Sequence, residues 1–372
     1  MYQRFTQTLC KAMVLALAGA MLQACSDATT PAGNNGSQDL SYSGPGSKWD
    51  FDLAADGTFT IERRPDVNSP VDMTVTGTYD RLESGFILFT VGGGSGQNPP
   101  AQGDKAWAIE VPGYALLVRP IQSGSDQIIA MVSAGSCPSS DINANWVLVR
   151  KELSILANDE TASYSGVFNY AVATNTPSLQ SQYSLVNPTS DLGGQPIPSS
   201  ATCADGILDL SGVGAVMYLT DNGGAIVHTG TETTDESDDT IYFALDQQAI
   251  GNVTALDGDY AGMAYNEDAP AGQRVFAVAL SCTSGSCTGD VMSDVEAGTT
   301  AGSAFSIELS GTVDSPVNGL ISGTVQGGND PASALTCMVN TNASGTTKNI
   351  INCVGQAPGD TTKMFNVMFV SK

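Results

Sequence analysis

Histidine is nearly missing from this sequence, since His228 is the only one in 372 residues. Any Ser-His-Asp, Cys-His or histidine-metal mechanism would therefore have to use that residue. It lies in the alternating stretch 226–230, which is typical of a strand residue that faces solvent. Motifs of the Gly-x-Ser-x-Gly, His-Glu-x-x-His and Gly-x-x-x-x-Gly-Lys types are also missing. No catalytic residue is assigned, and we expect a protein that is not an enzyme.

Positive charge is scarce as well. The chain has 14 Lys and Arg residues against 38 Asp and Glu residues, a net charge of −24. No Lys or Arg stands between Lys151 and Arg274, whereas 17 acidic residues lie from Glu152 to Asp268. Such a surface repels nucleic acid and anionic lipid headgroups, so a nucleic-acid partner is excluded. The excess of carboxylates is typical of a solvated face on an exported protein.

Long apolar runs are lacking too. The longest one near the N-terminus, Ala12 to Leu22, is shorter than the roughly 20 residues that a membrane-spanning helix needs. It follows Arg4 and Lys11, and no acidic residue stands in the first 24 positions. This order is typical of a secretory leader, which we place at residues 1–24.

The leader ends in Leu22-Gln23-Ala24-Cys25. This segment resembles the lipobox of bacterial lipoproteins, which implies cleavage before Cys25 and attachment of acyl chains such as palmitate to that residue. Several acyl chains anchor a protein stably in a membrane. Because Ser26 is not an inner-membrane retention signal, we expect the outer membrane, with the protein facing the periplasm or the cell surface. Removal of Arg4 and Lys11 brings the mature charge from −24 to −26.

The remaining chain has the composition of an all-β protein, with 41 Gly, 17 Pro and no stretch that favours a long helix. Residues 25–39 are small and polar and indicate a flexible tether with a reach of about 20 Å. After it, three segments open alike, at Tyr42, Tyr164 and Tyr260, each followed by a small residue and Gly. We therefore expect three β modules, at 40–151, 160–247 and 257–372, the first closing on the strand that contains Trp146.

Alternation within the modules predicts antiparallel hairpins. Trp49, Phe51 and Leu53 alternate with polar residues, and Asp56-Gly57 then turns the chain into a second alternating strand. Meanders of this kind hide their edges by closing into small barrels or stacking into sandwiches. At this level the chain is similar to surface lipoproteins with lipocalin-like barrels, including the transferrin-binding and factor H-binding families. The similarity is architectural, and the ligands of those families are not carried over.

Six cysteines remain once Cys10 leaves with the leader and Cys25 is acylated, and an even number in an exported chain indicates disulfides. A two-residue turn between Cys282 and Cys287 would place them opposite one another on adjacent strands. A second candidate hairpin does the same for Cys337 and Cys353. By elimination Cys137 pairs with Cys203 and joins the first module to the second.

Calcium is the one ion that the sequence suggests, since carboxylates are its preferred ligands. The segments considered are 50–56, 232–239 and 257–259, none with EF-hand spacing, and no metal ligand is assigned. All three tryptophans, Trp49, Trp107 and Trp146, fall in the expected first module. If its first and last strands were neighbours, Trp49 and Trp146 would meet, either as core or as part of an apolar ligand site.

Taken together, the sequence predicts an envelope or surface lipoprotein that acts as a non-enzymatic binding or accessory structural module for a protein or an envelope polymer. Two alternatives stay open. One is a lipocalin-like carrier, which requires a closed barrel with an apolar cavity near Trp49 and Trp146. The other is a carboxylate-based envelope hydrolase, which requires two facing carboxylates about 5–10 Å apart in a cleft.

Overall fold

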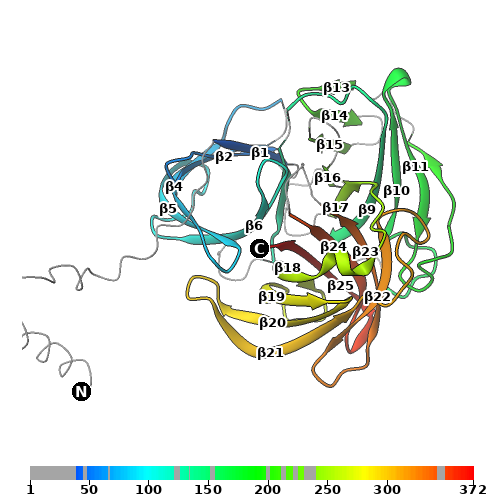
Figure 1. The fold of residues 1–372 in the computed structure, drawn as a ribbon. Helices are drawn as coiled ribbons and strands as arrows, with labels where there is room; N and C mark the ends of the chain where they lie inside the picture. The colour runs from blue at the N-terminus through cyan, green and yellow to red at the C-terminus, as the bar shows by residue number, and fades with distance from the viewer. Residues whose placement is uncertain are drawn as a thin grey trace, which may run out of the picture. The chain divides into compact units, whose positions relative to one another are not determined.

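The fold is all β, as predicted, and it contains two closed eight-stranded barrels and one nine-stranded sheet (Figure 1). The computed structural model describes residues 39–44, 48–65, 68–120, 126–133, 135–150, 156–197, 202–210, 215–220, 225–229, 240–341 and 348–372. These residues all belong to one compact unit. Among them, no helix is long and apolar enough to cross a membrane.

The first barrel, blue to cyan in Figure 1, consists of consecutive antiparallel strands. Their bounds are β1 Leu40–Gly44, β2 Lys48–Leu53, β3 Thr58–Arg64, β4 Met73–Arg81, β5 Phe86–Gly96, β6 Lys105–Val111, β7 Ala115–Pro120 and β8 Ile129–Val132. The hairpin predicted at Asp56-Gly57 joins β2 to β3, and Gly57 has a φ of +85° that favours glycine. Asp56 accepts hydrogen bonds from the backbone N–H and hydroxyl of Thr58, which fixes the turn.

The nine-stranded sheet has the order β12-β11-β10-β9-β17-β16-β15-β14-β13 and lies mainly in the green part of the chain (Figure 1). Its strands are β9 Ile142–Arg150, β10 Ser165–Ala171, β11 Thr176–Tyr183, β12 Gln195–Pro196, β13 Thr202–Ala204, β14 Ile207–Leu210, β15 Ala215–Leu219, β16 Ala225–Thr229 and β17 Ile241–Asp246. Two short 3-10 helices, η1 Val172–Thr174 and η3 Val253–Leu256, lie in connections.

The position of β9 corrects the expected first module. The barrel closes on β8, which pairs with β1, and β9 instead pairs with β10 and β17 at the centre of the sheet. Trp146 therefore packs among residues of the sheet, whereas Trp49 packs inside the first barrel. The expected meeting of Trp49 with Trp146 is wrong, because the strand that carries Trp146 does not belong to the barrel.

The second barrel, yellow to red in Figure 1, occupies the C-terminal third of the chain. Its strands are β18 Gly258–Asn266, β19 Val275–Thr283, β20 Ser286–Asp294, β21 Thr299–Glu308, β22 Leu320–Gly327, β23 Ser333–Asn340, β24 Ile350–Ala357 and β25 Asp360–Ser371. It closes through a long register of β18 with β25, from Tyr260 opposite Ser371 to Asn266 opposite Phe365.

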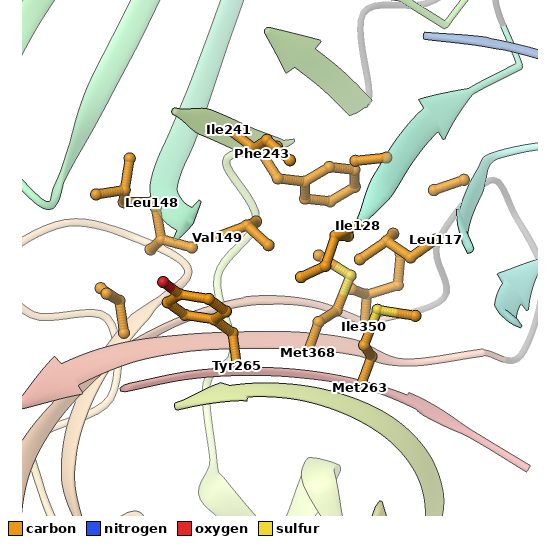
Figure 2. Packing of buried hydrophobic residues seen from close by; sticks show 14 of the residues in the cluster. Leu117, Ile128, Leu148, Val149, Ile241, Phe243, Met263, Tyr265, Ile350 and Met368 are labelled. Atoms are coloured by element: carbon orange, nitrogen blue, oxygen red, sulfur yellow. The ribbon is translucent and has the colours of Figure 1, made fainter. Parts of the chain in front are cut away.

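Both barrels are apolar on the outside as well, where they meet the sheet. One cluster of buried residues includes Leu117 of β7, Phe243 of β17 and Met368 of β25, together with many neighbours. Figure 2 shows part of this cluster, with side chains of both barrels pointing toward those of β9 and β17. Burial of this size removes a large apolar area from water, so the cluster holds the barrels and the sheet together.

The structure contains the three disulfides that the sequence analysis favours, Cys137–Cys203, Cys282–Cys287 and Cys337–Cys353. The last two join directly opposed residues of adjacent strands, and all four of their cysteines lie in the core of the second barrel. Cys203 lies on the edge strand β13, and Cys137 lies in the connection from β8 to β9. This bond therefore ties the edge of the sheet to the segment that leaves the first barrel.

The double variant Cys137→Ser with Cys203→Ser removes the Cys137–Cys203 bond and should lower the free energy of unfolding. The bond spans 66 residues, for which chain entropy gives a stabilisation of about 4 kcal/mol, against about 2 kcal/mol for the 5-residue span of Cys282–Cys287. Denaturant unfolding of the variant, compared with the wild type, measures this loss. An unchanged free energy of unfolding would show that the bond does not restrain the unfolded chain as the entropy model requires.

Candidate ligand-binding cavity

An apolar cavity of about 220 Å³ lies inside the first barrel. Its wall is built from inward-facing residues that alternate along β2, β3, β4 and β5, and strands β6, β7 and β8 complete it. Most of the lining is aromatic or aliphatic, and the cavity is lined by Trp49, Phe51, Phe59, Ile61, Arg63, Met73, Val75, Phe89, Val91, Asn98, Pro100, Asp104, Lys105, Ala106, Val118, Pro120, Gln127 and Ile129.

Aromatic rings hold the wall in shape. The ring of Phe89 meets that of Phe59 edge-on at 5.2 Å between centroids and that of Phe51 at 6.2 Å. Trp49 packs against Phe51 at 6.3 Å, and its indole is only 8% exposed. Such edge-to-face pairs fix ring orientation beyond what burial alone provides. The wall is therefore pre-formed around the empty space.

A buried polar network closes the other end of the barrel. Strands β4 and β6 give Met73 and Lys105 to the cavity at one end, and they place Arg81 and Glu110 at the opposite end. The Arg81 guanidinium donates from Nε to Glu110 Oε2 at 2.9 Å and from Nη2 to Oε1 at 3.0 Å. The Tyr42 hydroxyl donates to Glu110 Oε1 at 2.6 Å and accepts from the Gly113 N–H at 2.9 Å.

This network is rigid because each carboxylate oxygen of Glu110 has a donor. Arg81 also lies over the ring of Tyr79 at 5.1 Å, and the Tyr79 hydroxyl donates to the Ala54 carbonyl at 2.7 Å. Burial, reinforced by the charge of Glu110, raises the pKa of Tyr42 well above its ordinary value, so its hydroxyl remains a donor. The network thus acts as a floor, and the cavity opens at the Lys105 end.

The open end carries the polar groups of the lining. Arg63 forms a two-pronged pair with Asp72, from Nε at 3.1 Å and from Nη2 at 2.9 Å, and its guanidinium lies 5.9 Å from the Trp49 ring centroid. Asp104 accepts from the Ala101 N–H at 2.8 Å, and Lys105 pairs with Glu296 of the second barrel. An apolar interior with a few polar groups at its mouth is the usual design of a small-molecule site.

The second barrel also opens at one end. A hollow of about 600 Å³ there is lined by Phe276, Phe305 and Phe365, with Asn266 and Asp330 among its polar residues. It is more open to solvent than the cavity of the first barrel, and its far end is filled by the two barrel disulfides. The first barrel therefore offers the better-enclosed site.

The carboxylates at the cavity do not form a hydrolase pair. Asp104 is the single acidic residue in the described lining of the first-barrel cavity, and a two-carboxylate mechanism needs a second one facing it. Glu110 lies within the floor, where Arg81 and Tyr42 occupy both of its oxygens. The cavity can hold an apolar molecule, but it has no paired acid and base.

Of the residues that the sequence analysis considered, Cys25 and the acidic run 232–239 lie outside the described residues. His228 lies on β16, opposite Met217 and Tyr242, and its side chain also falls outside the description. Trp49 lines the cavity, and Trp107 packs on the outer face of the same barrel.

In the other two acidic segments, 50–56 and 257–259, carboxylates accept hydrogen bonds or form ion pairs with other residues of the chain. Asp50 pairs with Arg64 at 2.6 Å, Asp52 accepts from the Ser41 hydroxyl, and Asp257 accepts from the Ser284 N–H. Within the described ranges, no group of three or more His, Cys, Asp or Glu side chains is arranged to hold a metal ion.

No protein-family model and no curated protein sequence matches the chain. Among solved structures, it is similar to transferrin-binding protein B of Neisseria meningitidis serogroup B, with 12% identity and a TM-score of 0.27. Two variants of transferrin-binding protein B from Haemophilus parasuis Hp5 match at 11% and 10% identity, also with TM-scores of 0.27. Each match covers 88% of this chain and 65% of the other, so this chain spans just under two thirds of their length.

Loss of the Glu110 carboxylate should strongly destabilise the first barrel. Glu110→Leu leaves the Arg81 guanidinium without its buried counter-charge, and breaking a buried pair in this way costs about 3–5 kcal/mol. The matched control is Glu62→Leu, which removes a half-exposed partner of Arg64 and should cost about 1 kcal/mol or less. Denaturant unfolding of both variants measures the difference, and equal losses would contradict the role of the network as a floor.

Proposed function

We propose that this chain is a lipid-anchored, non-enzymatic binding protein whose first barrel takes up a small apolar molecule. The observation that carries the proposal is the pre-formed apolar cavity next to Trp49, closed below by the Glu110 network and open at the Lys105 end. This arrangement favours the carrier among the functions that the sequence left open. The expected protein or envelope-polymer partner stays a prediction.

The size of the cavity limits the ligand. At about 220 Å³ it is smaller than the roughly 300–1,000 Å³ of sites for drug-sized molecules. It therefore suits one short alkyl chain or one to two rings. Because the wall is rigid and apolar, binding removes apolar surface from water with little cost in protein ordering.

A neutral two-ring fluorophore, 1-naphthylamine, should bind the purified protein with a Kd of about 0.1 mM or tighter. Its fluorescence should rise, and the tryptophan emission of the protein should be quenched by energy transfer. The variant Ala106→Trp adds a large ring to a partly buried wall position and should abolish binding. The control Ala334→Trp adds the same ring to an exposed position on β23 and should leave binding unchanged.

The two variants separate cavity binding from nonspecific adsorption. If Ala106→Trp and Ala334→Trp both bind the fluorophore as the wild type does, the cavity is not the site and the proposal fails. Circular dichroism and thermal melting of each variant show whether the barrel is intact.

The anchor is a separate part of the proposal, supported by the lipobox residues Leu22 to Cys25. Cys25→Ser removes the thiol that receives the diacylglycerol, so the protein should no longer label with radioactive palmitate and should leave the membrane fraction. Cys10→Ser, which changes a cysteine of the leader, is the control and should label normally. Palmitate labelling of Cys25→Ser at the wild-type level would disprove the anchor.

A further inference from the structure

The outer wall of the first barrel carries a cation that the cavity does not use. Trp107 on β6 and Arg119 on β7 are directly opposed across the strand pair, and Leu88 of β5 is opposed to Trp107 on the other side. These residues alternate with Ala106, Ala108 and Val118, which pack inside the barrel. The row formed by Leu88, Trp107 and Arg119 therefore faces away from the cavity.

A crevice of about 310 Å³ lies over this row, between the two barrels. The second barrel contributes Val275, Ala277 and Met292 to its wall. The volume is at the lower end of the range for small-molecule sites. An aromatic ring, a thioether and aliphatic side chains form the body of the crevice, and Arg119 supplies its strongest hydrogen-bond donor.

The guanidinium of Arg119 is incompletely satisfied. Its Nε is buried and has no hydrogen-bond acceptor among the residues that the structure describes. Burial lowers the pKa of Arg119, and the charge of Asp126 acts in the opposite direction. A buried donor without an acceptor is costly, and charged side chains inside proteins are normally paired. The site therefore favours an added anionic acceptor.

The nearby carboxylates already have donors. Both oxygens of Asp126 accept backbone N–H groups, from Gly272 and Arg274, each at 2.8 Å. Asp294 accepts from the Ala297 N–H at 3.0 Å, and Glu296 pairs with Lys105. The side chains of Lys105 and Glu296 are 38% and 55% exposed, so their pair is weak and Lys105 can turn toward another anion.

We propose that this crevice is a second binding site, specific for a small monocarboxylate with an aromatic or aliphatic body. The carboxylate accepts from Arg119, whose planar fork matches its two oxygens, and Lys105 adds a second positive charge at the edge. The body of the ligand packs against Trp107 and Met292. The site is distinct from the first-barrel cavity, because it lies on the opposite face of β6 and β7 and Lys105 is the one described lining residue that the two share.

Benzoate tests the proposal, with benzamide as its neutral isostere and benzylamine as its cationic one. Isothermal titration of the purified protein should show benzoate binding about 10-fold or more tighter than benzamide, since hydrogen bonds between charged groups are much stronger than neutral ones. Benzylamine should not bind. Equal affinity for benzoate and benzamide would overturn the proposal.

Variants locate the site. Arg119→Gln should lose the preference for benzoate over benzamide, and Arg119→Lys should keep part of it. Arg64→Gln is the matched control, because Arg64 is already paired with Asp50 and does not line the crevice. Since Arg119 has an unsatisfied donor, Arg119→Gln should melt at a temperature no lower than the wild type. A folded Arg119→Gln that keeps the full preference would also overturn the proposal.

Two further variants test independence from the cavity. Met292→Trp fills the crevice and should abolish benzoate binding while 1-naphthylamine still binds. Ala106→Trp should abolish binding of the fluorophore while benzoate still binds. Loss of benzoate binding in Ala106→Trp, with Met292→Trp unaffected, would place the carboxylate in the barrel and refute a separate site.

Discussion

The apolar junction between the barrels and the sheet is the constraint on which the rest of the structure depends. Strands at the junction must be apolar on both faces, since one face lines a barrel and the other packs against its neighbours. In β7, Leu116 and Val118 point into the first barrel while Leu117 joins the junction. In β25, Val367 and Phe369 face the second barrel while Met368 joins the junction. Sequence alternation is lost in such strands because both sides are buried.

That loss explains what the sequence could and could not predict. The hairpin around Asp56-Gly57 was predictable because polar and apolar residues alternate in the sequence on both sides of the turn, from Trp49 to Leu53 and from Thr58 to Ile61. The hairpin disulfides were predictable because turn residues fix which cysteines face one another. The strand that carries Trp146 ends in a continuous apolar run, Trp146 to Val149, and such a run does not reveal which sheet it joins. Its assignment to the first barrel was therefore wrong.

The cavity could not be predicted for a related reason. Trp49, Phe51 and Phe59 are identified as inward-facing by alternation, yet an inward face is compatible with a filled core or with an empty one. The outcome depends on how far side chains from strands distant in sequence reach across the barrel, as with Phe89 against Phe59. Arg119 presents the same difficulty, because a lone arginine in a strand gives no sign of the second barrel that buries it.

The two barrels differ in how extensively their first and last strands pair, and this difference affects how readily each barrel opens. The second barrel has a long closing register of β18 with β25 and two disulfides in its core. In the first barrel, the described residues give one closing pair, Ser43 opposite Val132, and no disulfide joins two of its strands. Local opening requires least free energy where the fewest contacts must be broken. The barrel with the apolar cavity is therefore also the one whose seam opens most readily. The buried network at Glu110 joins β1, β4 and β6 at the end away from the cavity mouth and so holds that part of the wall in register.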